Sequence, residues 1–276
     1  MTTPSKTIVN QDLILAARKG LVPVHERARM GGFGNMLRKE LGQWWGTRTW
    51  WVQILIWVLI LNGITTIVAL TETGTPEAVL QEAVQTFLDI AVLAVGIGTI
   101  IVAQGAIVGE KQLGTAAWVM SKPASRSAFI LAKTLAYAIG YGITAILIPS
   151  AIFIITIRQL IPVQLALMPF IAGVALAAII GQLFYLTLTL MLGTFFSSRG
   201  PIAGIGIVFI MTGLLLNGFI PFQVLIVSPW PLPDVAAGLA LGTELPSVWP
   251  VPIIAVAVWI VVMTAVALWR FEREEF

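Results

Sequence analysis

The stretch GEKQLGTAAWVMSKPASRSAFILAK, residues 109–133, decides how the chain is organised. It is rich in charged and turn-forming residues, and it lies between an apolar run that ends at Val108 and another that begins at Ala128. A charged side chain at the centre of a bilayer costs roughly 2.5–3.5 kcal/mol, so this stretch has to face water or another protein. The break at Gly114 and the apolar residues after it predict a short amphipathic helix across the ends of two membrane helices.

The composition is typical of a membrane protein with several spans. Of the 276 residues, 58% are hydrophobic and 11% are charged, which does not suit a soluble domain of this length. Because the chain has no cysteine, disulfides, thiolate metal sites and cysteine nucleophiles are excluded. A single histidine, His25, leaves no imidazole cluster for metal binding or acid–base chemistry. We therefore expect an all-α polytopic membrane protein without a metal site.

Six apolar runs are each long enough to cross the bilayer as a helix, which takes about twenty residues for about 30 Å of hydrocarbon. They lie at about Trp50–Leu70, Phe87–Val108, Ala128–Ile157, Val163–Phe196, Pro201–Ile220 and Val251–Trp269. An even number of spans returns both termini to one side of the membrane. The chain then divides into an N-terminal segment (1–49), a six-helix transmembrane domain (50–270) and a tail (271–276).

Basic residues gather on one side of these spans. The N-terminal segment, residues 109–133, the connection at 197–200 and residues 270–276 hold fifteen of the sixteen Lys and Arg residues, and only Arg158 lies elsewhere. Cytoplasmic segments carry such an excess, so we place both termini and the 109–133 stretch in the cytoplasm. This topology also accounts for the basic character of the chain, and we expect no nucleic-acid partner.

The end of the N-terminal segment predicts an amphipathic helix. Apolar side chains recur at helical spacing at Phe33, Leu37, Leu41, Trp44 and Trp45, and polar ones fall on the other side at Arg38, Lys39, Glu40 and Gln43. Such a helix suits the membrane interface, where its apolar face contacts lipid. The alternative is a helix packed on a cytoplasmic partner, and both can hold along its length.

Two features of the later spans depart from plain apolar helices. The third and fourth runs, of about thirty and thirty-four residues, are longer than a bilayer requires and should tilt or project into the cytoplasm. Pro149 and Pro169 lie inside these runs and predict kinks. Between the fifth and sixth runs, residues 221–250 contain six prolines around short apolar stretches, at 222–228 and 234–241, which we interpret as short helices that re-enter the outer leaflet. A plain extracellular loop is the alternative.

Few polar side chains within the spans are available to contact a transported molecule. The candidates are uncharged, namely Gln182, Asn217, Asn62 and Gln104, and this favours an apolar or amphipathic passenger over an ion. Gln182, near the middle of the fourth run, is our first candidate for lining a pathway, and Asn217 is the second. Alternatively, these side chains bond neighbouring helices.

The sequence lacks the motifs of a catalytic chain. It contains no GxxxxGK[ST] phosphate loop, no H-E-x-x-H pair and no G-x-S-x-G elbow. We therefore expect neither enzymatic activity nor a bound cofactor in this chain.

The 109–133 stretch resembles the permease subunits of ATP-binding cassette (ABC) transporters of the type-2 integral membrane family. These permeases carry a Glu, a Gly-Thr pair, a short apolar helix, then Pro, Ser and Arg leading into a span with a Lys. The matching residues are Glu110, Gly114, Thr115, residues 118–120 with Trp118, Pro123, Ser125, Arg126 and Lys133. The basic-acidic entry at 38–41, followed by Arg48, is a second match. The resemblance covers the chain from about Gly31, and residues 1–30 are a departure from it.

This resemblance implies a permease in a prokaryotic plasma membrane. Its partners would be cytoplasmic ABC ATPase subunits that bind ATP and Mg²⁺, a second permease subunit and membrane lipid. In that case Glu110 bonds the first turn or the ATPase, Gly114 allows a sharp break, and Lys111, Lys122 and Arg126 add charge to the contact. Alternatively, Glu110 caps a helix and Arg126 and Lys133 extend to the interface. An ion-coupled carrier and a membrane scaffold or sensor remain alternative functions.

Overall fold

The computed structural model describes residues 30–115, 125–216, 219–245 and 247–274. These residues form helices joined by turns, and no strand occurs among them. Six helical runs are long and apolar enough to cross a membrane, at Thr49–Thr71, Pro76–Gln112, Arg126–Leu160, Leu167–Phe195, Arg199–Leu216 and Pro250–Glu272. The expected class, an all-α membrane protein with six spans, is therefore confirmed.

Several runs are built from more than one element. Before the first span comes α2 (Phe33–Trp45), and the span itself comprises α3 (Thr49–Trp57), the π-helix η1 (Val58–Asn62) and α4 (Gly63–Thr71). The second comprises α5 (Pro76–Ala103) and α6 (Val108–Gln112), and the third α8 (Arg126–Tyr141), η2 (Gly142–Leu147) and α9 (Ile148–Leu160). The rest are α10 (Leu167–Gly173), η3 (Val174–Ile179), α11 (Ile180–Phe195), α12 (Arg199–Leu216), α13 (Phe222–Leu225), α14 (Leu232–Leu241) and α15 (Pro250–Glu272).

The second span is longer than the apolar pattern predicts. It begins at Pro76 rather than near Phe87, because the Thr75 side chain accepts a hydrogen bond from the Ala78 amide and Pro76 suits the first helical position. The run reaches 37 residues, against 35 for the third and 29 for the fourth. The fourth span, which starts at Leu167, is thus shorter than predicted. All three exceed the length that hydrocarbon requires.

The prolines inside the third and fourth spans have different local effects. Pro149 is the second residue of α9, which follows the π-helical segment η2. Because proline has no amide hydrogen and its ring crowds the preceding turn, a widened turn before it is a usual accommodation. Pro169 lies in the first turn of α10, where no helical hydrogen bond is lost. The departure from α-helix in the fourth span is η3, which follows that turn.

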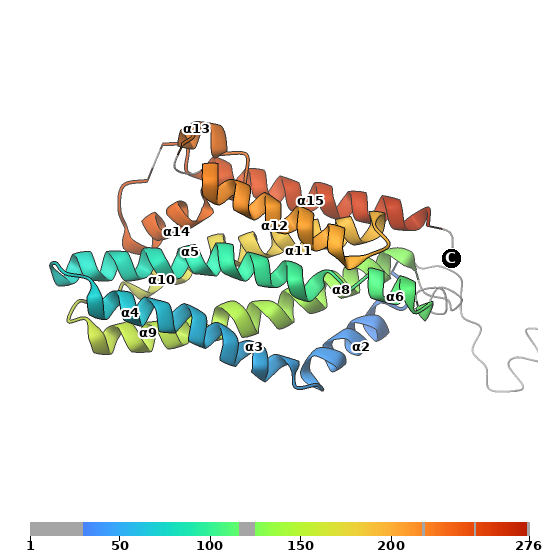
Figure 1. The fold of residues 1–276 in the computed structure, drawn as a ribbon, viewed down its shortest axis with the longest axis horizontal. Coiled ribbons are helices and arrows are strands. Elements are labelled where there is room, and N and C mark those ends of the chain that lie inside the picture. The colour runs from blue at the N-terminus through green and yellow to red at the C-terminus, as the bar shows by residue number, and fades with distance from the viewer. Residues whose placement is uncertain (1–29, 116–124, 217–218, 246, 275–276) are drawn as a thin grey trace, which may run out of the picture.

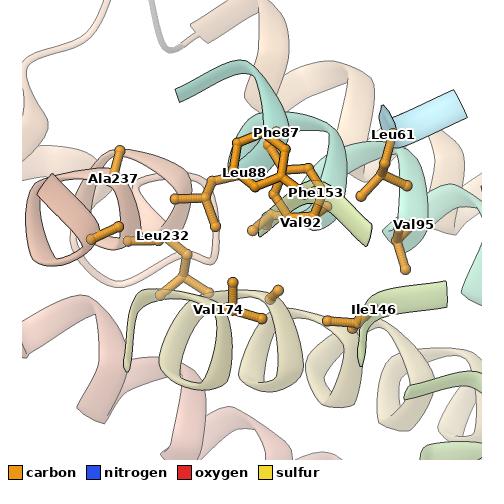
Figure 2. Close-up of a cluster of buried hydrophobic side chains, with 14 of the residues drawn as sticks. Leu61, Phe87, Leu88, Val92, Val95, Ile146, Phe153, Val174, Leu232 and Ala237 are labelled. Atoms are coloured by element: carbon orange, nitrogen blue, oxygen red, sulfur yellow. The ribbon is translucent and has the colours of Figure 1, made fainter. Parts of the chain in front are cut away.

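The core lies around α5, which packs against α4, α11, α12 and α14 (Figure 1). Figure 2 shows Phe87, Leu88, Val92 and Val95 of α5 among side chains from other spans and from α14. The Phe87 ring lies 4.4 Å, centroid to centroid, from the ring of Phe153. These side chains are essentially unexposed, so apolar packing within the chain holds the spans together.

Residues 221–245 form two short helices rather than a plain loop. α13 is a single turn, and α14 begins two residues before the predicted start and is terminated by Gly242, which follows Leu241 and has a left-handed φ of 68°. α14 packs against α5 and α10, and its Leu232 and Ala236 side chains are fully buried. It lies at the end of the bundle away from α2 and α6 (Figure 1).

Candidate functional site

The N-terminal helix α2 packs along α8, the first part of the third span. Trp44 is buried and meets Tyr137 and Tyr141 edge to face, with ring centroids 5.7 and 6.3 Å apart. Its indole lies against Gly140, where a Cβ atom would come within 2.6 Å of the ring. A glycine at 140 is therefore what allows this close approach. Residues 33–45 are thus helical, and the predicted location of this helix at the membrane interface stays a prediction.

Exposure along α2 follows the predicted faces except at Trp45 and Glu40. Arg38 and Lys39 are exposed, while Phe33, Leu37 and Leu41 are half-buried. Trp45 is exposed on the outer edge of the helix. Glu40, which the pattern places among the polar residues, is buried and faces α8. A carboxylate in this position needs a positive partner.

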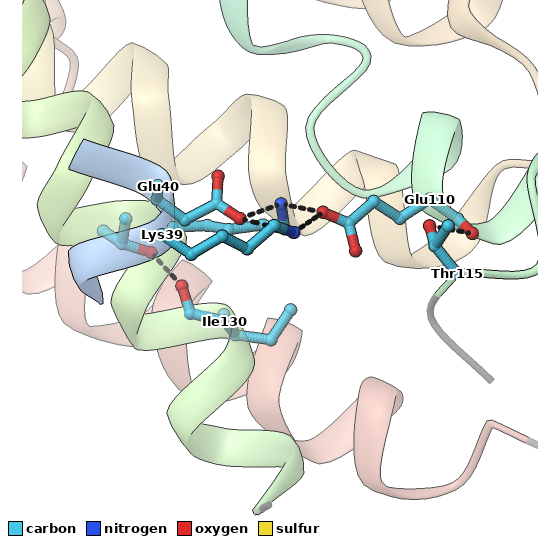
Figure 3. A network of polar contacts seen from close by, with 7 residues as sticks. Lys39, Glu40, Glu110, Thr115 and Ile130 are labelled. Carbon is cyan, nitrogen blue, oxygen red and sulfur yellow. Dashed lines mark hydrogen bonds and ion pairs between the residues drawn. The ribbon is translucent and has the colours of Figure 1, made fainter. Parts of the chain in front are cut away.

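That partner is Lys133, whose ammonium group bridges two carboxylates. Its Nζ lies 2.9 Å from Glu40 Oε1 and 2.7 Å from Glu110 Oε1. Lys39 approaches the same two oxygens, at 3.3 and 3.0 Å. Two lysines and two glutamates therefore form one network, whose formal charges cancel (Figure 3). We call these four residues the charge network.

The four side chains of the charge network range from buried to exposed. The Lys133 side chain is 3% exposed, Glu40 7%, Glu110 16% and Lys39 53%. Burial lowers the pKa of Lys39, but the hydrogen bond and the charge of Glu110, with those of Glu40, outweigh it and raise that pKa above its ordinary value. The second oxygen of Glu110, Oε2, is buried and has no hydrogen-bond partner among the described residues.

The charge network joins three elements of the chain. Glu110 stands on α6 at the end of the second span, Lys133 on α8 at the start of the third, and Glu40 on α2. Removing one partner of a buried ion pair costs several kcal/mol, because the other charge is left buried and unpaired. The charge network therefore holds these three elements together at one end of the bundle.

Hydrogen bonds anchor the chain on either side of residues 116–124. Gly114 has a φ of 67°, in the left-handed region that favours glycine, and the Thr115 hydroxyl donates to the Glu110 carbonyl at 3.2 Å. Ser125 caps α8 by accepting from the Ala128 amide at 3.0 Å. The Ser125 amide also donates to the Gly31 carbonyl. The predicted helix at 116–120, with Trp118, and residues Lys122 and Pro123 lie outside the described residues.

Arg126 and Lys111 contact the end of the sixth span. Arg126 Nη1 donates to the carbonyl oxygens of Glu272 and Glu274, at 2.7 Å each. Carbonyls at a helix C-terminus carry partial negative charge, which the guanidinium offsets. Lys111 Nζ lies 3.0 Å from Glu274 Oε1. The C-terminal end of α15 thus packs onto the same end of the bundle as the charge network.

The turn between the fourth and fifth spans is tied to α6 as well. Lys111 Nζ donates to the Thr194 carbonyl at 3.0 Å, and Gln112 Nε2 donates to the Ser197 carbonyl at 2.8 Å. α6 therefore contacts segments from the third, fourth and sixth spans. These contacts were not predicted, because they join residues more than eighty positions apart through main-chain oxygens.

Most of the chain, including α6 and α8, matches a model of a known protein family. A family model described as a protein of unknown function, DUF2705, matches residues 51–276. The chain belongs to the DUF2705 family. No curated protein matches it. The DUF2705 match includes Glu110 and Lys133, whereas α2, with Lys39 and Glu40, precedes the matched residues.

The predicted pathway residues of this DUF2705 protein differ in their contacts. Asn62 donates to the Pro149 carbonyl at 3.2 Å and so joins the first span to the third. Gln104 donates to the Ile101 carbonyl of its own span. Gln182 is 1% exposed, and neither its amide nitrogen nor its amide oxygen has a partner among the described residues. Asn217 lies outside those residues.

Within the described part of this DUF2705 protein, no three His, Asp or Glu side chains lie close enough together to hold a metal ion. The charge network has a structural and an electrostatic role. It fixes the relative positions of α2, α6 and α8 through charges that need one another. Residues 113–115, at the edge of this assembly, are largely exposed, and the Leu113 side chain is 78% exposed.

Proposed function

We propose that this chain is the permease subunit of an ABC transporter of the type-2 integral membrane family. Two copies, or this chain and a sister subunit, would enclose a route through the bilayer. Separate cytoplasmic ATPases would bind ATP and Mg²⁺ and drive it. The description of the DUF2705 family assigns no function, so the proposal depends on the residues themselves.

The observation that carries the proposal is the Lys133 bridge between Glu40 and Glu110. It makes one unit of α2 and of the two span ends that flank residues 113–125. A permease that is driven by a separate ATPase needs a rigid connection of this kind, because motion imposed on a surface segment reaches the spans only through rigid contacts. In this reading both termini and the 109–133 stretch are cytoplasmic, and the protein resides in a prokaryotic plasma membrane.

The surrounding elements fit the same arrangement. α2 would lie along the cytoplasmic interface, where the exposed Trp45, Trp50 and Trp51 suit headgroup depth. α13 and α14, at the other end, would re-enter the outer leaflet. Because the described polar side chains deep in the spans are uncharged, an apolar or amphipathic molecule is the expected cargo, exported or flipped toward the outer leaflet.

Affinity purification tests the proposal directly. The tagged chain, extracted from its native host in a mild detergent, should bring with it an ATPase that contains a phosphate-binding loop. A stable complex that lacks any ATPase would instead support a scaffold or an ion-coupled carrier, and it would end the proposal.

Uncoupling variants test the role of the charge network. In the purified complex, Glu110→Ala should retain ATP turnover while transport falls. Without the Glu110 carboxylate, α6 is no longer held to α8, and motion of the ATPase is not passed on to both spans. Arg126→Glu should act likewise by releasing α15. Glu72→Ala, an exposed change in the turn between α4 and α5, is the matched control and should leave both activities unchanged. Transport that tracks ATP turnover in both test variants would remove this role.

A further inference from the structure

A pocket of about 400 Å³ lies in the turn between the third and fourth spans. The turn begins after Leu160, the last residue of α9, and ends where α10 begins at Leu167. The residues that line the pocket are Arg158, Ile161, Pro162, Val163, Gln164 and Leu165. Arg158 carries the one charge among them, and none of the six is acidic. We call this space the turn pocket, and its charge suits an anion.

The guanidinium group of Arg158 has no partner within the described part of the chain. Arg158 is exposed, and it forms neither an ion pair nor a hydrogen bond there. Although a positive charge is favourable at a helix C-terminus, no carbonyl of α9 accepts a hydrogen bond from it. By contrast, Arg126 donates to the Glu272 carbonyl and Arg270 pairs with Glu274. All five N–H donors of Arg158 are therefore available to a ligand.

Main-chain donors of the same turn are also without partners. The Ile161 amide closes the last turn of α9 by donating to the Ile157 carbonyl at 3.0 Å. After it, Pro162 has no amide hydrogen, and the amides of Val163 and Gln164 donate to no described residue. Backbone amides in a turn and a guanidinium group are common ligands of phosphate and carboxylate oxygens.

Apolar side chains on both sides of the turn place it at the edge of the hydrocarbon. Ile155 and Leu160 on α9 and Met168 on α10 are exposed. On a membrane span such side chains contact acyl chains. The C-terminal end of α9 lies at the end of the bundle away from α2 and α6 (Figure 1). At this depth Arg158 can reach the headgroup layer while its apolar neighbours remain among the lipid tails.

We propose that Arg158 binds the phosphate of a phospholipid headgroup in the turn pocket. The planar guanidinium donates two parallel N–H bonds to the phosphate oxygens, and the acyl chains of the same lipid pack on Leu160 and Met168. This proposal depends on the chain being a membrane protein and not on the proposed transport function.

A lipid is favoured over a soluble phosphate by the charges at this end of the bundle. The turn between α4 and α5, together with the start of α5, carries Glu72, Glu77 and Glu82, and it lies at the same end (Figure 1). These carboxylates repel anions that approach from water. A phospholipid is confined to the membrane beside the turn pocket, so its local concentration is high.

Photolabelling of the full-length chain in lipid nanodiscs tests the proposal. The probe is a phosphatidylglycerol that carries a diazirine close to the glycerol end of one acyl chain. A diacylglycerol with the same diazirine chain provides the comparison without a phosphate. Relative to Ile67, an exposed apolar residue of α4, Leu160 and Met168 should prefer the phosphatidylglycerol by about fivefold. An equal preference at Ile67 and at Leu160 and Met168 would overturn the proposal.

Three variants assign the preference to Arg158. Arg158→Gln should reduce it at Leu160 and Met168 to the level at Ile67, because the charge is lost while a polar side chain remains. Arg158→Lys retains the charge without the planar pair of donors and should retain part of the preference. Arg48→Gln, at an exposed arginine before the first span, is the matched control and should change nothing. A preference that survives Arg158→Gln would exclude Arg158 as the phosphate ligand.

Inorganic phosphate distinguishes a lipid from a soluble anion. In excess, it should lower the labelling of Leu160 and Met168 by the phosphatidylglycerol probe no more than sodium chloride of the same ionic strength does. Sodium chloride screens the charge of Arg158 but does not form paired hydrogen bonds with it. A loss of labelling that is specific to inorganic phosphate would overturn the lipid as the source of the bound phosphate.

Discussion

Lys133 Nζ lies 2.7 Å from Glu110 Oε1 and joins the start of the third span to the end of the second. The same nitrogen lies 2.9 Å from Glu40 Oε1, on a helix that precedes the first span. Because Lys133 is nearly unexposed, water cannot replace it as a partner of either carboxylate. The relative position of three elements thus depends on one ammonium group.

Replacing Lys133 should destabilise the protein far more than replacing Lys39. Lys133→Met leaves two facing carboxylates with one exposed lysine, and removing one partner of a buried pair typically costs about 3–5 kcal/mol. Lys39→Met retains Lys133 between the carboxylates and should cost less than about 1 kcal/mol, as exposed pairs do. Unfolding by sodium dodecyl sulfate in mixed micelles measures both. Equal losses in the two variants would show that burial does not set the strength of the network.

The contact of α2 with α8 predicts opposite effects for two glycine substitutions. Gly140→Ala places a methyl group within 2.6 Å of the Trp44 ring and should destabilise the protein by about 1–3 kcal/mol, because the indole has to move. Gly42→Ala, on the exposed face of α2 with no atom nearby, should stabilise it by about 0.5–1 kcal/mol.

A double-mutant cycle identifies the contact responsible. In a Trp44→Ala background, Gly140→Ala should lose most of its cost, because the ring that obstructs the methyl group is gone. The free energies of unfolding of the four proteins supply the test. A cost that persists without Trp44 would mean that the methyl group disturbs α8 itself.

Hydropathy predicted the six spans because each is an apolar run of about the length that the bilayer requires, or longer. It did not predict the start of α5, since residues 76–86 include Glu77, Gln81, Glu82 and Gln85 and their helix depends on the Thr75 cap instead. The π-helical segments have no hydropathy signal at all. Pro149 hinted at η2, whereas no proline accompanies η3 in a comparable position.

The candidate site was predicted as a set of residues but not as an arrangement. Glu110 and Lys133 were singled out, while Glu40 was assigned to a solvated face. Its partner lies 93 positions away in the sequence, and helical periodicity carries no information about contacts at that distance. Only the packing of α2 on α8 reveals that Glu40 is buried.

Asp234, at the start of α14, predicts a pH dependence of stability. Burial raises the pKa of this carboxyl above its ordinary value of 3.8, although the hydrogen bond from Gln85 opposes the shift. The folded protein therefore holds the proton more tightly than the unfolded chain. This contribution to stability is complete below the ordinary pKa and is lost as the pH rises through the raised one.

Asp234→Asn should therefore raise the free energy of unfolding at neutral pH and leave it unchanged near the acidic end of the titration. Asparagine retains an oxygen that can accept from Gln85 Nε2. Glu244→Gln, an exposed change in a pocket that Gln85 and Asp234 also line, is the control and should alter stability by less than about 0.5 kcal/mol at either pH. A stabilisation by Asp234→Asn that is equal at both pH values would exclude the titration of Asp234 as its cause.

The orientation in the membrane is testable at two single positions, because the chain contains no cysteine. Leu113, 78% exposed, lies beside the charge network, and Thr73 is exposed in the turn between α4 and α5. Figure 1 places these two turns at opposite ends of the bundle. Fifteen of the sixteen basic residues lie in segments on the predicted cytoplasmic side, so Leu113 should face the cytoplasm.

An impermeant maleimide added to intact cells should therefore label Thr73→Cys and spare Leu113→Cys. After permeabilisation both should react, since both side chains are exposed in the folded protein. A cytoplasmic ATPase can act on residues 113–125 only if they lie on its own side of the membrane. Labelling of Leu113→Cys in intact cells would thus reverse the topology and remove the physical basis of the proposed coupling, whatever the stability of the charge network.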